Sequence, residues 1–134
     1  MGKQLELFKT EVSFDTLIEN VRGWADNKGI LKSENAPKQM MKVMEELGET
    51  AGAIAKNKAT DEIIDGIGDT FVTLIILSYQ LGLEPADCLQ AAWNEIKDRK
   101  GKTVNGVFVK EEKSVSMPKS CLNTLPPDDY ELDN

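Results

Sequence analysis

Two clusters of acidic residues lie in the middle of the chain and could hold a metal ion. Each contains three carboxylates at helical spacing, and together they comprise Glu45, Glu46, Glu49, Glu62, Asp65 and Asp69. Side chains three and four positions apart share one face of an α-helix. Hard divalent cations prefer oxygen ligands, and the chain has no histidine that could serve instead. The spacing therefore predicts a carboxylate site for Mg²⁺, or for Mn²⁺, between two helices.

A simpler interpretation is open for the first cluster. Lys42 precedes Glu46 by one turn, which is the spacing of ordinary contacts on a solvated helix face. The second cluster is harder to explain in this way, because the stripe that holds Asp65 and Asp69 continues through Ile76. Burying a charge without compensation is costly. The pattern in the second cluster thus favours a functional role.

Four helices are expected to position these acids, in an all-α fold. They span approximately residues 13–28, 37–56, 60–81 and 85–99. Ser13 is the expected N-cap of the first helix, and Thr60 or Asp61 that of the third. Gly82 and Gly101 are expected to end the third and fourth helices.

The C-terminal part departs from the helical pattern. Residues 103–109 alternate as a small β-hairpin does, with Asn105-Gly106 as a type I′ turn signal. We expect residues 1–110 to form one helical domain that includes this hairpin. Residues 111–134 are polar and rich in Pro and Asp, which predicts a loosely ordered tail.

Apolar residues predict where the helices are buried. The second helix has an apolar side opposite its acids, made of Met40, Val43, Met44, Leu47, Ala51 and Ile54. The third helix is apolar nearly all round from Thr70 to Leu81, which predicts burial on all sides. Three neighbouring helices of this length would hardly cover that surface. We therefore expect a homodimer or a higher homo-oligomer.

Composition excludes several classes of protein. The 134 residues carry a net charge of −7, whereas nucleic-acid-binding domains usually present a basic surface. No apolar run approaches the roughly 20 residues that span a bilayer, and we expect no signal peptide. Cys88 and Cys121 have no metal or redox spacing. We expect a cytoplasmic protein that binds neither nucleic acid nor membrane.

Several motifs resemble a known family. Residues 45–49, EELGE, match the motif EExxE, and a helix containing Trp24 precedes them. Ile67-Gly68-Asp69 and then Asn94-x-x-Lys97 follow in the expected order. Over roughly residues 13–110 the chain resembles the MazG-like, all-α nucleoside triphosphate pyrophosphohydrolases. Its short single-domain form is similar to phage-encoded members, which would place it in the host cytoplasm.

One departure concerns the family's second motif, ExxD. If Asp69 is its aspartate, Gly66 occupies the glutamate position. A literal ExxD exists one turn earlier, at Glu62–Asp65. Either Asp65 substitutes for the missing glutamate or the register is shifted. We expect Asp65, rather than Glu62, to share a metal ion with Asp69.

The resemblance implies hydrolysis of a (d)NTP to the (d)NMP and pyrophosphate, with Mg²⁺ as cofactor. The expected metal ligands are Glu46, Glu49, Asp65 and Asp69, with Glu45 as the general base. The expected phosphate-binding residues are Asn94, Lys97 and Lys100, with Arg99 as a further candidate. Trp24 is the candidate for contact with the base.

Two other functions are compatible with the same residues. One is a non-catalytic helical interaction module whose acids only solvate it and whose tail recruits a partner. The other is a metal-dependent phosphohydrolase that releases orthophosphate or acts on a diphosphate.

Overall fold

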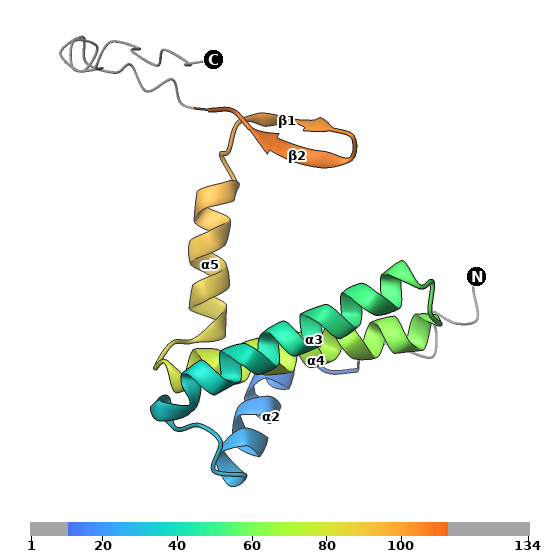
Figure 1. Ribbon diagram of the computed structural model, residues 1–134. Helices are drawn as coiled ribbons and strands as arrows, with labels where there is room; N and C mark the ends of the chain where they lie inside the picture. Colours follow the sequence, from blue (N-terminus) through green and yellow to red (C-terminus); the bar gives the residue numbers. More distant parts are fainter. Residues whose placement is uncertain (1–10, 113–134) are drawn as a thin grey trace, which may run out of the picture. The chain divides into compact units, whose positions relative to one another are not determined.

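Four α-helices and one β-hairpin make up the part of the chain that the computed structural model describes, residues 11–112 (Figure 1). The elements are α2 (Phe14–Asn27), the 3₁₀ turn η1 (Ser33–Asn35), α3 (Ala36–Ala55), α4 (Thr60–Gln80), α5 (Pro85–Ile96), β1 (Gly101–Val104) and β2 (Val107–Lys110). The predicted helical class with a small hairpin is confirmed. Most of the predicted polar tail, with Cys121, lies outside the described residues.

The chain divides into two compact units. The first ends at Ile96 and contains all four described helices, and the second begins at Lys97 and contains the hairpin. The sequence pattern predicted a single domain of residues 1–110 that includes both the helices and the hairpin. We describe each unit by itself.

The helix ends show where local signals decide the fold. The backbone N–H of Thr16 donates to Ser13 Oγ at 3.2 Å, so the predicted N-cap of α2 is confirmed. The predicted cap of α4 is wrong, because Thr60 already lies in the helix and Ala59 precedes it without a side-chain hydrogen bond. Helix α5 also stops before the predicted Arg99. The carbonyl of Lys100 accepts the N–H of Glu111, which extends the hairpin ladder and leaves no helix there.

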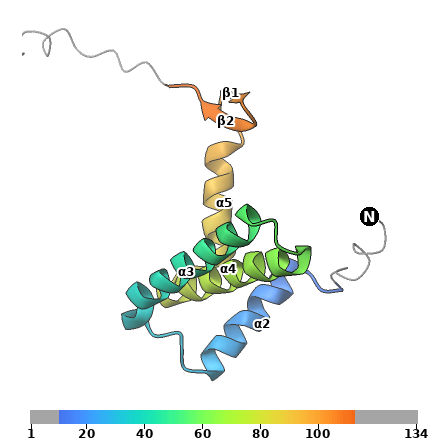
Figure 2. The same ribbon diagram turned by 45° about the vertical axis from the view of Figure 1, so that its right-hand side comes forward.

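Helices α3 and α4 lie side by side and antiparallel, and α2 packs against α4 (Figures 1 and 2). The core between them consists of Ile18, Ala25, Ala36, Val43, Ile75 and Ile76. Two buried amides join the elements: Gln39 Nε2 donates to the carbonyl of Thr73 at 3.1 Å, and Gln80 Nε2 donates to that of Ile30 at 2.9 Å. These bonds fix α3, α4 and the loop after α2 in one arrangement, because breaking them would leave buried polar groups unpaired.

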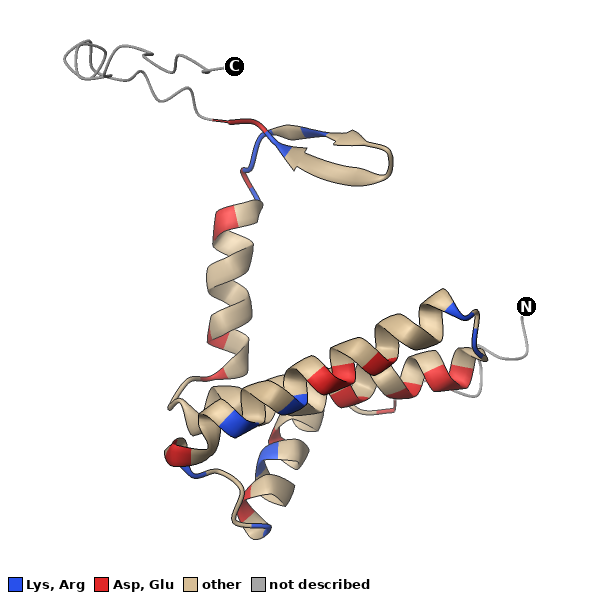
Figure 3. Ribbon diagram, in the orientation of Figure 1, with Lys and Arg blue, Asp and Glu red and all other residues tan. Residues whose placement is uncertain are grey.

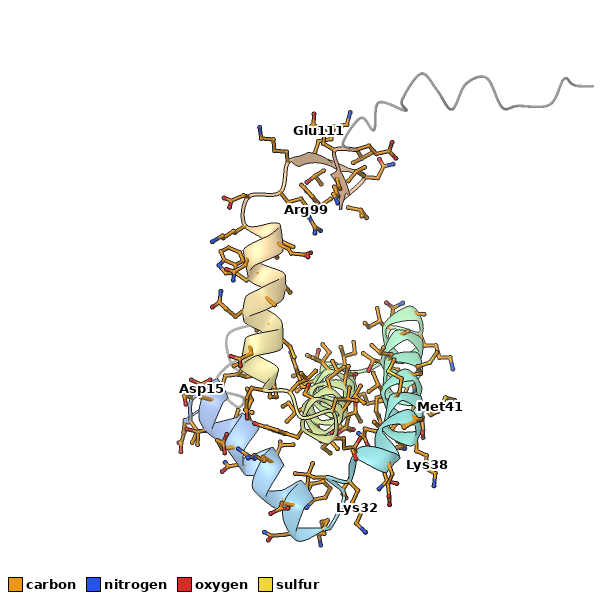
Figure 4. The ribbon with its side chains drawn as sticks, turned by 90° about the vertical axis from the view of Figure 1, so that its left-hand side faces the viewer. Asp15, Lys32, Lys38, Met41, Arg99 and Glu111 are labelled. Carbon is orange, nitrogen blue, oxygen red and sulfur yellow. The ribbon has the colours of Figure 1, made fainter. Side chains whose placement is uncertain are left out.

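The face that α3 turns towards α4 contains both polar and apolar residues. Gln39, Val43 and Thr50 are buried there. The predicted apolar side is mostly exposed: Met40, Met44, Leu47 and Ile54 are 44%, 57%, 51% and 54% exposed. Only Val43 of that side is buried, so the prediction of a buried apolar side is wrong within one chain. Figure 4 looks along α4 and shows Met41 on the side of α3 away from it.

The second half of α4 is not buried on all sides within one chain, as had been predicted. Ile75 and Ile76 are buried, but Phe71, Leu74 and Leu81 keep about half of their surface exposed. The reason is that α2 and α3 cover only part of the helix. Helix α5 bends away from α4 by 102° and cannot cover the rest. Among the described residues no single helix is long and apolar enough to cross a membrane, and α4 with α5 would meet that criterion only as this bent pair.

The hairpin forms around the predicted turn. Asn105 and Gly106 have φ angles of 50° and 78°, as a type I′ turn requires, so this prediction is confirmed. The paired strands run from Gly101 to Lys110, slightly beyond the predicted residues 103–109. A Cβ atom at Gly101 would lie 2.5 Å from Cζ of Phe108, so the ring packs where only glycine leaves room.

Candidate metal centre

A small cavity between α3 and α4 gathers most of the predicted acids. Its volume is about 190 Å³, and it is lined by Glu46, Glu49, Thr50, Ala53, Glu62, Asp65, Gly66 and Asp69. We call it the acidic cavity, because five of these eight residues carry carboxylates. Figure 3 shows acidic residues on adjoining turns of the two helices. All four predicted metal ligands line it, and Glu62 lines it too.

A close contact between the two helices sets the width of this cavity. Thr50 Oγ1 donates to the carbonyl of Glu46 at 2.7 Å and faces Gly66 of α4. A Cβ atom at Gly66 would lie 2.5 Å from that oxygen and 3.3 Å from Cβ of Thr50. A glutamate at position 66 therefore has no room in this packing.

The remaining ambiguity is whether Asp65 or Glu62 shares an ion with Asp69. Asp65 and Asp69 lie one turn apart, and two short carboxylates at that spacing can converge. Glu62 lies two turns from Asp69, roughly 10 Å along the helix at about 1.5 Å per residue. It also lies 3.7 Å from the ammonium group of Lys58. Glu62 is thus better placed for a second ion or a lysine.

We expect Asp65→Asn to weaken Mg²⁺ binding about tenfold more than Glu62→Gln does, a difference of about 1.4 kcal/mol. The reason is that only Asp65 is within one turn of Asp69. Isothermal titration of both variants with Mg²⁺ measures this difference. If Glu62→Gln is the more damaging substitution, the literal ExxD register is the correct one.

Glu46 is the least accessible carboxylate of the cavity, with its side chain 16% exposed. Desolvation raises its pKa above the ordinary value for glutamate, and the charges of Asp69 and Glu49 raise it further. The positive charge of Lys42 lowers the pKa of Glu46. Burial and the neighbouring acids of α3 and α4 thus both disfavour the charged form of Glu46, and a bound cation would relieve the repulsion.

The raised pKa of Glu46 predicts how stability depends on pH. A carboxyl whose pKa is raised in the folded state binds its proton more tightly there, so its contribution to stability is lost as the pH rises through that pKa. Without divalent cations, the melting temperature should fall as the pH rises from the ordinary glutamate range to neutrality. Glu46→Gln should flatten this dependence in thermal scans. An equally steep dependence in the variant would contradict the role given to Glu46.

Two lysines that were not among the predicted site residues lie beside these acids. Lys42 Nζ lies 2.8 Å from Glu45 Oε2 and 4.0 Å from Glu46 Oε1. Lys58 Nζ lies 3.7 Å from Glu62 Oε2 at the other end of the cluster. The spacing of three or four residues was visible in the sequence, but it is also the spacing of ordinary surface pairs.

Glu45, the predicted general base, lies outside the acidic cavity. It lines a separate open hollow of about 500 Å³, formed mainly by α3, which Glu49 and Glu62 also border. One residue along a helix is a rotation of about 100°, so Glu45 and its neighbour Glu46 face different hollows. Glu45 therefore lies at the rim of the acidic cluster.

Two of the predicted base- and phosphate-binding residues, Trp24 and Asn94, are in the first unit but do not line the acidic cavity. Trp24 is 50% exposed on α2 and is not among the residues that line the cavity. Asn94 lies near the end of α5 and accepts a hydrogen bond from Gln90 Nε2 at 3.1 Å. Lys97 and Lys100 belong to the second unit. Their role at the acidic cavity stays a prediction.

The chemical type of the ligands fits Mg²⁺, but the carboxylates do not converge on one point. Within residues 11–112, no three acidic or cysteine side chains converge closely enough to hold a metal ion. Four of the five cavity carboxylates are exposed side chains, so they have the freedom to turn towards one another. The donor set is thus all oxygen and free of histidine, as a hard cation requires.

A comparison with known proteins gives one partial match. Over 64 residues the chain is 44% identical to a protein of Haemophilus phage HP1 (strain HP1c1), described as an uncharacterized 18.2 kDa protein in the rep-hol intergenic region. The match covers 48% of this chain and 39% of the phage protein, so the chain spans about two fifths of that relative's length. No family model matches the chain. No solved structure matches it either.

Proposed function

We propose that the protein is a metal-dependent pyrophosphohydrolase that converts a (d)NTP to the (d)NMP and pyrophosphate. The observation that carries this proposal is the acidic cavity, where two helices contribute five carboxylates to about 190 Å³. The pKa of Glu46, which is raised by desolvation and then by the charges of Asp69 and Glu49, supports the proposal, because acids with perturbed pKa values are common at functional sites. The motifs EExxE and NxxK support the choice of reaction by resemblance.

In this proposal Glu46, Glu49, Asp65 and Asp69 hold Mg²⁺. A divalent cation at such carboxylates neutralises phosphate charge and lowers the pKa of a bound water. Glu45 stays the proposed general base. It lies at the rim beside the ligands, and its half-exposed side chain can turn towards a water at the cavity mouth.

A panel of nucleotides distinguishes this function from its two alternatives. The protein is incubated with canonical and modified nucleoside triphosphates and diphosphates, with and without Mg²⁺, and the products are separated. Monophosphate and pyrophosphate support the proposal. Orthophosphate indicates the other regiochemistry, and no turnover of any nucleotide favours the interaction module.

We further propose that two copies of the chain associate through the exposed side of α3. Met40, Met44, Leu47, Ala51 and Ile54 follow a spacing of three and four residues, the pattern by which one helix packs against another. A second apolar surface supports association: α2, α4 and α5 border a groove of about 640 Å³ that includes Phe71. The free, exposed Cys88 suits a reducing cytoplasm, where we place the activity.

Leu47→Asp is expected to convert a dimer to a monomer. Burying one leucine contributes about 1.5–3 kcal/mol, and a twofold interface contains it twice. The loss should therefore weaken the dimer by roughly 100-fold or more. Light scattering at micromolar concentration measures the change. Lys38→Asp, on an exposed position of the same helix (Figure 4), is the matched control. A wild-type monomer with full activity would rule out this assembly.

A further inference from the structure

We propose that Lys42 is a phosphate-binding residue of the acidic cavity, and that its ammonium group moves from the carboxylates to the triphosphate when Mg²⁺ occupies the site. The inference rests on the proposed function, because it assigns a role within the same site. It differs from the assignment of phosphate binding to Lys97 and Lys100, which belong to the second unit.

The position of Lys42 is what singles it out. Its ammonium group lies between a carboxylate at the rim, Glu45 at 2.8 Å, and one that lines the cavity, Glu46 at 4.0 Å. Lys42 is on α3 itself, so its position beside the acids does not depend on the position of the second unit. The side chain is 52% exposed, so an incoming ligand can reach it from solvent. The ammonium group donates a hydrogen bond to Glu45 Oε2 and keeps further N–H donors for another ligand.

The exchange follows from competition for the same oxygens. Without metal, Lys42 is the cation that offsets the charge of Glu46. With a divalent ion held by Glu46, the ammonium group of Lys42 would be repelled and no longer needed to offset that charge. The flexible four-carbon stem of lysine then allows the charge to turn to the mouth of the cavity. A triphosphate approaching several carboxylates needs a positive group at that mouth.

The other lysine beside the cluster has a weaker claim. Within residues 11–112, Lys58 forms an ion pair with Glu62, at 3.7 Å, and none with a cavity acid on α3. Lys38 lies one turn before Lys42 on α3 and is exposed, with no hydrogen bond or ion pair among the described residues. Lys38 is therefore the matched control for the loss of one positive charge from the same helix.

The first measurement is Mg²⁺ binding alone, by isothermal titration of the full chain. Lys42→Met should bind Mg²⁺ about three- to tenfold more tightly than wild type, because a competing charge near the site is gone. Lys42→Arg should bind Mg²⁺ as wild type does, since the charge is kept. Lys38→Met should have no effect. Far-UV circular dichroism checks that every variant is folded.

The second measurement is binding of inorganic tripolyphosphate at saturating Mg²⁺, which needs no knowledge of the base. Lys42→Met should bind it about tenfold more weakly, as expected for a half-exposed charge-assisted hydrogen bond. Lys42→Arg should retain most of the affinity. A role in folding alone cannot make one ligand bind more tightly and the other more weakly.

Opposite changes in the two affinities support the inference. Unchanged affinities in Lys42→Met overturn it and leave the proposed function standing. Tighter Mg²⁺ binding with unchanged tripolyphosphate binding also overturns it, because Lys42 is then only a counter-ion of the empty site. If wild type binds neither ligand, the proposed function fails and this inference fails with it.

Discussion

Glu49→Gln is expected to lower Mg²⁺-dependent release of pyrophosphate by roughly 100-fold or more, which corresponds to about 2.7 kcal/mol of transition-state stabilisation. Glu49 borders both the acidic cavity and the open hollow beside it, so it lies where the two meet. The substitution keeps the shape of the side chain and removes the charge that a hard cation requires. Because Glu49 is exposed, the fold should not change.

Steady-state rates at saturating Mg²⁺, together with far-UV circular dichroism, measure both parts of this expectation. Glu19→Gln is a suitable control, since Glu19 is an exposed helical acid paired with Arg22 at 3.8 Å on α2. It should leave the rate unchanged. Near-native turnover in Glu49→Gln would restore the interpretation of the first cluster as a solvated helix face.

Gly66→Ala is expected to destabilise the protein by about 1–3 kcal/mol, the usual cost of overpacking, and to reduce activity. The added Cβ atom would meet Thr50 Oγ1 at 2.5 Å and push α3 and α4 apart at the acidic cavity. Gly68→Ala is the matched control two residues away. A Cβ atom there meets nothing within 4 Å, so alanine should stabilise the helix by about 0.5–1 kcal/mol.

In denaturant unfolding, the free energy of unfolding should therefore fall in Gly66→Ala and rise in Gly68→Ala. Thr50→Ala removes the oxygen in the contact, so combining it with Gly66→Ala should recover part of the lost stability. Gly66→Glu, which creates the motif ExxD at residues 66–69, should be more damaging than Gly66→Ala. A stable and more active Gly66→Glu variant would show that the close contact between the helices is wrong.

Local signals explain what could be predicted from the sequence. Ser13 caps α2 because its hydroxyl reaches a backbone N–H three residues on, and Asn105-Gly106 turns because both residues tolerate positive φ. The acidic cavity follows equally directly from helical periodicity. Glu46 and Glu49 share one face of α3, and Asp65 and Asp69 share one face of α4. To predict that these acids line one cavity, it was enough to assume that the two helices are adjacent.

Other features depend on which faces of the helices pack together in the tertiary structure, and the periodicity of one helix does not determine this. The apolar side of α3 was expected in the core, yet Leu47 is 51% exposed because Thr50 and Gly66 bring the other side of the helix against α4. The end of α5 was misplaced because the pairing of the hairpin, a longer-range interaction, begins at Lys100. From the sequence, Lys42 was interpreted as an ordinary surface contact of Glu46, because the phosphate-binding lysine that we propose and a surface ion pair have the same spacing.

The most direct test of the proposed function is ³¹P NMR of the wild-type protein with its best nucleoside triphosphate in Mg²⁺. Our account predicts that monophosphate and pyrophosphate appear in equal amounts and that an excess of EDTA abolishes the reaction. Release of orthophosphate with a diphosphate, or the same rate in EDTA, would contradict it.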